Sequence, residues 1–266
     1  MNKTKIEWCD TVWNPVWGCL NHCFYCYAKQ IAKRFASNIE KKEREFCLKN
    51  NIRYSDISKD LEEFKPVFLE SNFNKKFPKK PSRIFVNSMS DIAFWDRDWM
   101  LRVFGKIVDN PQHQFLFLTK EPEIYRKFGF AKNCLLGVTV NKQKDVERIK
   151  SLRFKKYIDG NNIFVSFEPL LENMTEIGIE KYDTATIEEK LEVLGILEKE
   201  ILYLDLKDVD WIIIGGMTGK KPFYPPEEWI QVIIRKADNL KIPVFEKDNL
   251  RKIWNKAPRR EFSNDL

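Results

Sequence analysis

The sequence predicts an α/β fold, a partial or nearly closed (β/α)6–7 barrel with a small helical insertion. Short apolar segments alternate with longer amphipathic ones, as in a parallel sheet with crossover helices. The apolar segments are almost continuously hydrophobic, which indicates strands covered on both faces. Polar residues follow directly after these segments, where a barrel of this kind gathers its functional site.

Six segments are rich in β-branched or aromatic residues and too short for helices, so we expect strands there. They are Arg83–Asn87, Gln114–Thr119, Leu135–Val140, Asn162–Phe167, Trp211–Gly215 and Pro243–Glu246. A first strand around Asn14–Gly18 would lead the chain into a cysteine-rich loop.

Amphipathic segments between these strands predict the helices. They are Tyr27–Ala36, Trp99–Asn110, Gln143–Leu152, Thr186–Leu202 and Glu227–Asn239. Thr186 and Glu189 have the spacing of a capping box. We interpret residues 1–258 as a single domain with a helical insertion at about 183–207, and residues 259–266 as a flexible tail.

Length and composition indicate an enzyme-sized globular chain. Its 266 residues, 43% of them hydrophobic, are enough for a sizeable core. The first residues lack the apolar stretch of a signal peptide. No run approaches the roughly 20 apolar residues that cross a bilayer, so no membrane association is expected. With free cysteines, this predicts a reducing cytoplasmic location.

The charge balance is basic, with 46 Lys and Arg against 39 Asp and Glu, a net charge of +7. Two stretches hold much of the excess: Lys33, Arg34, Lys41, Lys42 and Arg44, then Lys75, Lys76, Lys79, Lys80 and Arg83. Such stretches suit a polyanionic partner such as DNA or RNA, and they equally suit ordinary solvated surface. Charge alone does not decide between the two.

Cys19, Cys23 and Cys26 form a C-x3-C-x2-C cluster that argues against a disulfide framework, because three cysteines so close cannot all pair. Cysteine thiolates ligate iron–sulfur clusters, and these three can hold three corners of a [4Fe-4S] cube. The alternative is a structural zinc site with His22 as its fourth ligand. Zinc motifs usually come as two separated pairs of ligands. Three further cysteines stand singly and are interpreted mainly as buried thiols: Cys9, Cys47 and Cys134.

With the aromatic Tyr25 before the last cysteine, this spacing resembles the radical S-adenosylmethionine (SAM) superfamily. The resemblance implies a barrel of the radical SAM type, with a [4Fe-4S] cluster and S-adenosyl-L-methionine as cofactors. SAM would bind the open iron and accept one electron, which breaks a carbon–sulfur bond and gives a 5′-deoxyadenosyl radical.

A second resemblance covers nearly the whole chain, which is similar to the phage Gp37/Gp68-type family, DUF5131. Six blocks in order support it: Trp13–Pro15, Ile84–Asp91, Leu118–Lys120, Leu136–Thr139, Phe164–Leu170 and Trp211–Gly216. Members often have a longer gap between the first two cysteines, whereas this chain has the superfamily spacing. The family carries no established reaction, so it indicates architecture rather than substrate.

The superfamily resemblance also implies contacts to SAM. The Tyr25 ring would cover the adenine, and Lys120 would bind the methionyl carboxylate. The turn after the second strand would meet the methionyl amino group through Ser88, Met89, Ser90 and Asp91. Ribose hydroxyls would meet Thr139 and Asn141, and close backbone approach would be permitted at Gly215 and Gly216. Ser166, at another strand end, is assigned to the cofactor as well.

Two residues are candidates for catalysis. Glu168 would contact ribose or substrate, or belong to an ion pair that stabilises the barrel. Cys9 would return a hydrogen atom to a substrate radical, or remain a small buried hydrophobe.

Two functions follow from these residues. The first is a radical SAM enzyme that takes electrons from a donor such as flavodoxin or ferredoxin, with modification or repair of DNA or RNA as the favoured reaction. The second is a non-catalytic nucleic-acid- or protein-binding module whose loop is stapled by zinc or a cluster.

Overall fold

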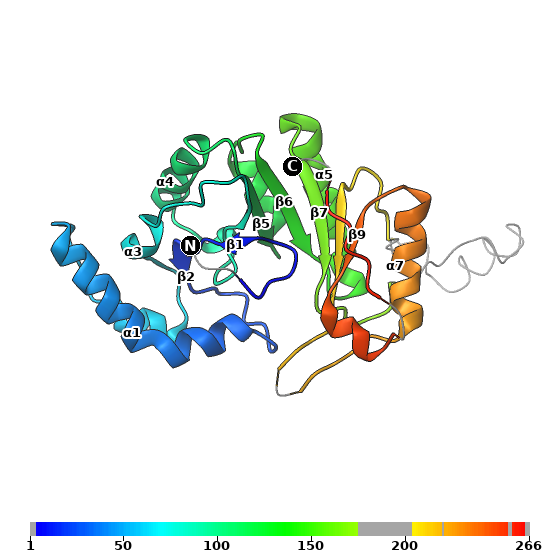
Figure 1. Cartoon of the computed structure of the whole chain (residues 1–266), viewed down its shortest axis with the longest axis horizontal. Helices are drawn as coiled ribbons and strands as arrows, with labels where there is room; N and C mark the ends of the chain where they lie inside the picture. The colour runs from blue at the N-terminus through cyan, green and yellow to red at the C-terminus, as the bar shows by residue number, and fades with distance from the viewer. Residues whose placement is uncertain (1–3, 175–203, 220, 255–256, 264–266) are drawn as a thin grey trace, which may run out of the picture.

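A parallel sheet curled into a half-barrel forms the centre of the molecule, seen in a computed structural model that describes residues 4–174, 204–219, 221–254 and 257–263 (Figure 1). Its seven strands run in the order β1-β4-β5-β6-β7-β8-β9. They are β1 Thr11–Val12, β4 Arg83–Phe85, β5 Gln114–Thr119, β6 Cys134–Thr139, β7 Asn162–Phe167, β8 Trp211–Ile214 and β9 Val244–Glu246. The mixed α/β fold with a partial, parallel barrel is thereby confirmed.

The predicted first strand, Asn14–Gly18, contains a strand that leads into the cysteine loop, but this strand does not belong to the main sheet. The strand that joins the main sheet is β1, which pairs with β4. Val16–Trp17 (β2) instead pairs antiparallel with Val67–Phe68 (β3) in a separate two-stranded sheet. The chain leaves the main sheet at Asn14, whose side-chain oxygen accepts a hydrogen bond from the Met89 backbone N–H at 3.1 Å. The proline that follows Asn14 has no N–H to donate to a ladder.

The helices form two groups (Figure 1). The convex face of the sheet is covered by α4 Arg97–Val108, α5 Glu147–Asp159 and α7 Glu227–Asn239. Beside β2 and β3 lie α1 Tyr27–Lys49, α2 Ser58–Glu63 and α3 Glu70–Phe73. Short 3-10 helices are η1 Ile92–Phe94, η2 Pro122–Lys127, η3 Gln143–Val146 and η5 Asp248–Lys252.

Helix α1 is longer than predicted, because its buried face continues past Ala36 through Glu40, Glu43 and Cys47. Glu43 accepts a hydrogen bond from the Ser71 backbone N–H at 3.0 Å. Because two of the buried side chains are acidic, apolar periodicity does not predict this part of the helix. The predicted helix Thr186–Leu202 lies outside the described residues, as does most of the insertion at 183–207.

Alternate residues of the strands build two cores. Outward side chains such as Phe117 and Val165 meet the helices. Inward side chains fill the concave face: Phe85, Leu116, Leu135, Phe164, Trp211, Ile213 and Phe245. Trp8 packs against this second cluster, with its ring centroid 4.6 Å from that of Phe85. A Cβ at Gly137 would come within 2.3 Å of the Phe164 ring, so glycine is what lets this ring lie across β6.

The edge strand β9 is covered by the segment at 259–262. Glu246 donates its backbone N–H to the Arg259 carbonyl at 3.0 Å, and Trp211 donates its indole N–H to the Glu261 carbonyl at 2.9 Å. A flexible tail is expected here from the sequence, whereas the described part of this stretch is hydrogen-bonded along β9. None of the described helices is long and apolar enough to cross a membrane.

Candidate functional site

A cavity of about 470 Å³ lies at the carboxyl ends of the strands. The loops that follow β4, β5, β7, β8 and β9 contribute to its wall, together with Thr139 at the end of β6 and the cysteine loop between β2 and α1. The structure brings thirteen of the predicted site residues onto this wall: Cys19, Cys23, Tyr25, Cys26, Ser88, Met89, Ser90, Asp91, Lys120, Thr139, Ser166, Glu168 and Gly216. Cys9, Asn141 and Gly215 do not line it.

The cysteine loop is fixed at its start by Gly18. Its φ of +100° favours glycine, and a Cβ there would lie 2.0 Å from the Lys65 carbonyl oxygen. Gly18 donates its N–H to the Met89 carbonyl at 3.0 Å, and Cys19 donates to the Phe64 carbonyl at 2.9 Å. The loop is therefore held between the turn after β4 and the end of α2.

Each of the three sulfur atoms accepts a hydrogen bond. Asn21 donates its backbone N–H to Cys19 Sγ at 3.4 Å, and Lys29 donates to Cys26 Sγ at 3.3 Å as the N-cap contact of α1. The Lys120 ammonium lies 3.2 Å from Cys23 Sγ. Such donors and a helix N-terminus stabilise thiolates.

Burial acts in the opposite direction on these thiols. It raises the pKa of Cys19 to about 12 and also raises the pKa of Cys26. The protonated thiols are therefore favoured until a metal competes for the sulfur atoms, and its binding would release protons.

The three thiols do not converge on the position of one ion. Across the described residues, no three His, Cys, Asp or Glu side chains are arranged to hold one metal ion together. His22 is exposed and lies on a neighbouring hollow of about 310 Å³, not on the cavity wall. A four-iron cube places each cysteine on a separate iron, so its ligands need not converge on one point.

Two buried polar groups on the cavity wall lack a partner within the described part of the chain. They are the Ser166 hydroxyl and the indole N–H of Trp8. Ser166 is fully buried and follows Phe164 on the inward side of β7. Buried polar groups are almost always hydrogen-bonded, so this wall suits a ligand with polar atoms.

The Asp91 carboxylate connects the cysteine loop with the end of β5. Its Oδ1 accepts from the Thr119 hydroxyl at 2.5 Å and the Ala93 N–H at 3.1 Å. Its Oδ2 accepts from the Asn21 amide at 2.7 Å and the Lys120 N–H at 3.0 Å. These four contacts fill the lone pairs of the carboxylate, which leaves none for the expected methionyl ammonium.

Lys120 is the centre of a polar cluster on one side of the cavity. Its ammonium contacts the Tyr25 hydroxyl and the Asn141 side-chain oxygen, the latter at 3.0 Å. Tyr25 donates to the same Asn141 oxygen at 2.5 Å. Asn141 donates in turn to the Pro169 carbonyl at 2.7 Å. Asn141 thus lies behind Tyr25 and Lys120 and positions them. It does not line the cavity, where it was expected to contact ribose.

Glu168 and Lys247 form an ion pair on another part of the wall. Burial alone would lower the pKa of Lys247, but the charge and hydrogen bond of Glu168 outweigh it and the pKa is raised. A Cβ at Gly215 would come within 3.0 Å of the Lys247 side chain and 3.2 Å of Glu168. Gly215 therefore makes room for the ion pair.

Cys9 lies behind the cavity wall. It is 8% exposed in the concave core, and its sulfur lies 3.8 Å from the Ile6 carbonyl. Burial raises its pKa to about 12. Its neighbour Trp8 lines the cavity instead.

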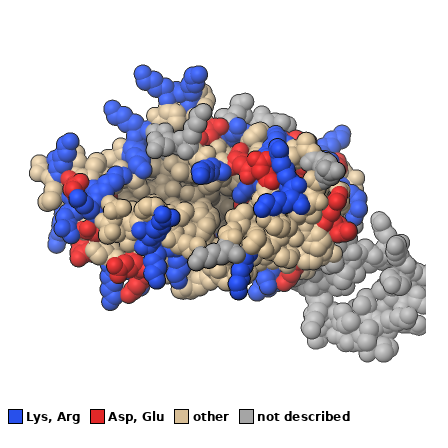
Figure 2. All heavy atoms as spheres, turned by 60° about the horizontal axis from the view of Figure 1, so that its bottom comes forward, with Lys and Arg blue, Asp and Glu red and all other residues tan. Residues whose placement is uncertain are grey.

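Basic side chains surround the hollowed face of the molecule, as Figure 2 shows. Lys5, Lys120 and Lys247 line the cavity itself. Among these only Lys120 was predicted as a site residue. Two acidic residues, Asp91 and Glu168, line the cavity as well, so the basic residues exceed the acidic ones by one.

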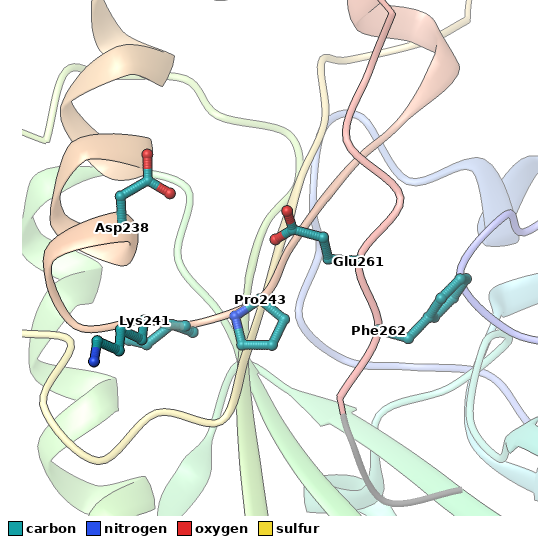
Figure 3. Close-up of a pocket in the computed structure, with 6 residues that line it drawn as sticks. Asp238, Lys241, Pro243, Glu261 and Phe262 are labelled. Atoms are coloured by element: carbon teal, nitrogen blue, oxygen red, sulfur yellow. The ribbon is translucent and has the colours of Figure 1, made fainter.

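A second hollow lies at the opposite, amino end of β9 (Figure 3). Its two carboxylates are already engaged: Asp238 pairs with Arg259 at 2.6 Å, and Glu261 accepts the Val244 N–H at 2.8 Å. It is also remote from the strand ends that carry the thiols. The larger set of convergent polar groups identifies the carboxyl-end cavity as the candidate site.

Comparison with known proteins gives one family match. No curated protein and no solved structure matches the chain. A family model described as a protein of unknown function (DUF5131) matches residues 3–259. Because this match spans nearly all of the 266 residues, the chain belongs to the DUF5131 family.

Proposed function

We propose that this protein is a radical SAM enzyme whose Cys19, Cys23 and Cys26 hold a [4Fe-4S] cluster. The favoured substrate class is DNA or RNA. One observation carries the proposal: all three thiols of the C-x3-C-x2-C loop line the same cavity as the polar residues from the strand ends. When bound, the cluster supplies one electron to SAM, which gives a 5′-deoxyadenosyl radical that abstracts hydrogen from the substrate.

The residues of the chain have separate tasks in this proposal. Asp91 fixes the cysteine loop against the end of β5 through Asn21 and Lys120. Lys120 places its ammonium group 3.2 Å from Cys23 Sγ and would bind the methionyl carboxylate as a point charge. Ser166 and Trp8 offer buried donors to the polar parts of the cofactor.

The part of the wall formed by Glu168 and Lys247 would face the substrate. Glu168 is held by Lys247, and this contact raises the pKa of the Lys247 ammonium group. A charged pair at the wall can orient polar groups of a substrate. An electron donor such as flavodoxin or ferredoxin would approach the exposed side of the cysteine loop.

Anaerobic reconstitution with iron and sulfide tests the proposal. We expect about four irons per chain, a broad brown absorbance, and release of 5′-deoxyadenosine from SAM on reduction with dithionite. One zinc per chain with no cleavage of SAM would contradict it and favour the non-catalytic binding module.

A further inference from the structure

The outer face of α1 is strongly basic. Its acidic side chains Glu40 and Glu43 are buried, and Glu40 accepts from the Tyr54 hydroxyl at 2.7 Å. All seven of its basic side chains are exposed, against one exposed acid, Glu45. They are Lys29, Lys33, Arg34, Lys41, Lys42, Arg44 and Lys49. Among the described ion pairs, only Arg44 has a carboxylate partner.

Aromatic rings interrupt this basic face. Tyr27, Ile31 and Phe35 follow at intervals of four residues, so they share one side of the helix. Phe24 stands just before them in the cysteine loop. The exposed fractions are 76% for Phe24, 52% for Tyr27 and 41% for Phe35. Exposed rings of this number beside lysines and arginines are unusual for a solvated surface.

The row of rings begins at the cavity. Tyr27 lines the cavity wall, where its hydroxyl donates to the Ser88 carbonyl at 2.9 Å. The guanidinium of Arg34 lies 5.4 Å from the centroid of the Phe35 ring, further along the helix. A ligand that follows α1 towards its N-terminus is therefore led to the three thiols.

We infer that this face of α1 binds a single-stranded nucleic acid and directs it to the cavity. Unpaired bases stack on exposed aromatic rings while lysines and arginines neutralise the phosphates, and this combination is how proteins bind single strands. The 23 residues of α1 span about 35 Å, the length of roughly ten nucleotides. That the bound strand is also the substrate rests on the proposed radical chemistry; its binding does not.

A second copy of the chain is a poorer occupant for this surface. A two-fold contact through α1 would place its basic side chains opposite one another, because such an interface uses the same patch twice. Like charges across an interface oppose association.

Fluorescence anisotropy with a labelled thymidine oligonucleotide of about 12 nucleotides, matched to the length of α1, tests the inference. We expect Phe35→Ala to weaken binding about tenfold. Phe154→Ala is the matched control, since Phe154 on α5 is 39% exposed and also lies under an arginine, Arg126. The control should bind like the unaltered protein.

Salt dependence tests the phosphate contacts separately. The double variant Lys33→Ala, Lys41→Ala should reduce the slope of log affinity against log salt by about 1.4, the loss of two phosphate contacts to a single strand. Lys127→Ala, Lys150→Ala removes two exposed lysines elsewhere and should leave the slope nearly unchanged.

Several results would overturn the inference. One is a failure of the unaltered protein to bind the oligonucleotide, and another is equal binding of the same sequence as a duplex. Equal losses of affinity in the α1 variants and in their controls would overturn it too. Self-association that is lost in Phe35→Ala would assign the face to a second copy instead. Binding that persists in Cys19→Ala, with no deoxyadenosine formed by the reconstituted protein, would contradict the radical chemistry alone.

Discussion

The side-chain amide of Asn21 donates a 2.7 Å hydrogen bond to the carboxylate of Asp91, 70 positions further along the chain. Through this contact the cysteine loop is tied to the turn after β4. The other Asp91 oxygen accepts from Thr119 at the end of β5. One buried carboxylate thus joins the predicted metal ligands to two strands of the half-barrel.

Replacing Asp91 with Ala should destabilise the protein by about 2–4 kcal/mol, because four donors lose a charged acceptor in a buried place. Urea denaturation measures the change. Asp96→Ala is the comparison, since Asp96 caps α4 at the surface and its loss should cost about 1 kcal/mol. Equal costs in the two variants would show that Asp91 has no special part in holding the loop.

Changing Cys19, Cys23 or Cys26 singly to Ala should abolish the iron–sulfur absorbance, because two thiolates rarely retain the cube. Cys47→Ala and Cys134→Ala should keep it, since both residues are buried away from the cavity. Iron content and the visible spectrum after reconstitution report the outcome. A requirement for Cys47 or Cys134, with Cys19 dispensable, would refute the ligand assignment.

Lys120→Ala should weaken SAM binding at least tenfold while iron is retained, because a hydrogen bond to a charged group is worth about 1.5–3 kcal/mol. Equilibrium dialysis with labelled SAM measures the affinity. Lys144→Ala serves as the control: Lys144 is exposed on the neighbouring hollow and lies off the cavity wall. An unchanged affinity in Lys120→Ala would place the methionyl carboxylate elsewhere.

Ser166→Ala should have opposite effects on stability and on binding. The free protein should be as stable or up to about 2 kcal/mol more stable, since a buried hydroxyl without a described partner is removed. SAM affinity should fall. Thermal unfolding with and without SAM separates the two effects. A stability loss with unchanged affinity would mean that the hydroxyl serves the fold.

Stability of the iron-free protein should fall as the pH rises from 9 to 12. Burial raises the pKa of Cys134 from 9.0 to about 12. Above pH 9 the unfolded chain releases this proton while the folded protein retains it, so unfolding is favoured. Urea midpoints across this range should decline less steeply in Cys134→Ala. An equal slope in both proteins would remove Cys134 as a cause.

The fold was predictable where segments are long and strongly patterned. The limits of β5 and β7 coincide with those expected from continuous apolar segments, and those of α7 with the limits expected from an amphipathic pattern. β1 and β2 have two residues each, too few for any period, and the proline after Asn14 separates them. The helices α2 and α3 were not predicted because they too are short, with six and four residues.

The site was predictable only in part, since sequence indicates strand ends but not pairings across the fold. Most of the residues predicted at the strand ends lie on the cavity wall. The partners of these residues come from far away in the chain: Lys247 for Glu168, and Asn21 for Asp91. The sequence therefore predicts cofactor contacts for Asp91 and Gly215. In the structure, Asp91 binds the cysteine loop through Asn21, and Gly215 leaves space for the Glu168–Lys247 ion pair.

Cys26 belongs to two structures at once, because its sulfur caps the first turn of α1 and lines the cavity. The position of this predicted metal ligand therefore depends on whether the first turn of α1 is ordered. By thermodynamic linkage, if a strand bound along α1 changes the affinity of the cysteine loop for its cluster, the cluster changes the affinity for the strand by the same factor. Under the proposed function, binding of the substrate along α1 would therefore alter how readily the cysteine loop takes up its cluster.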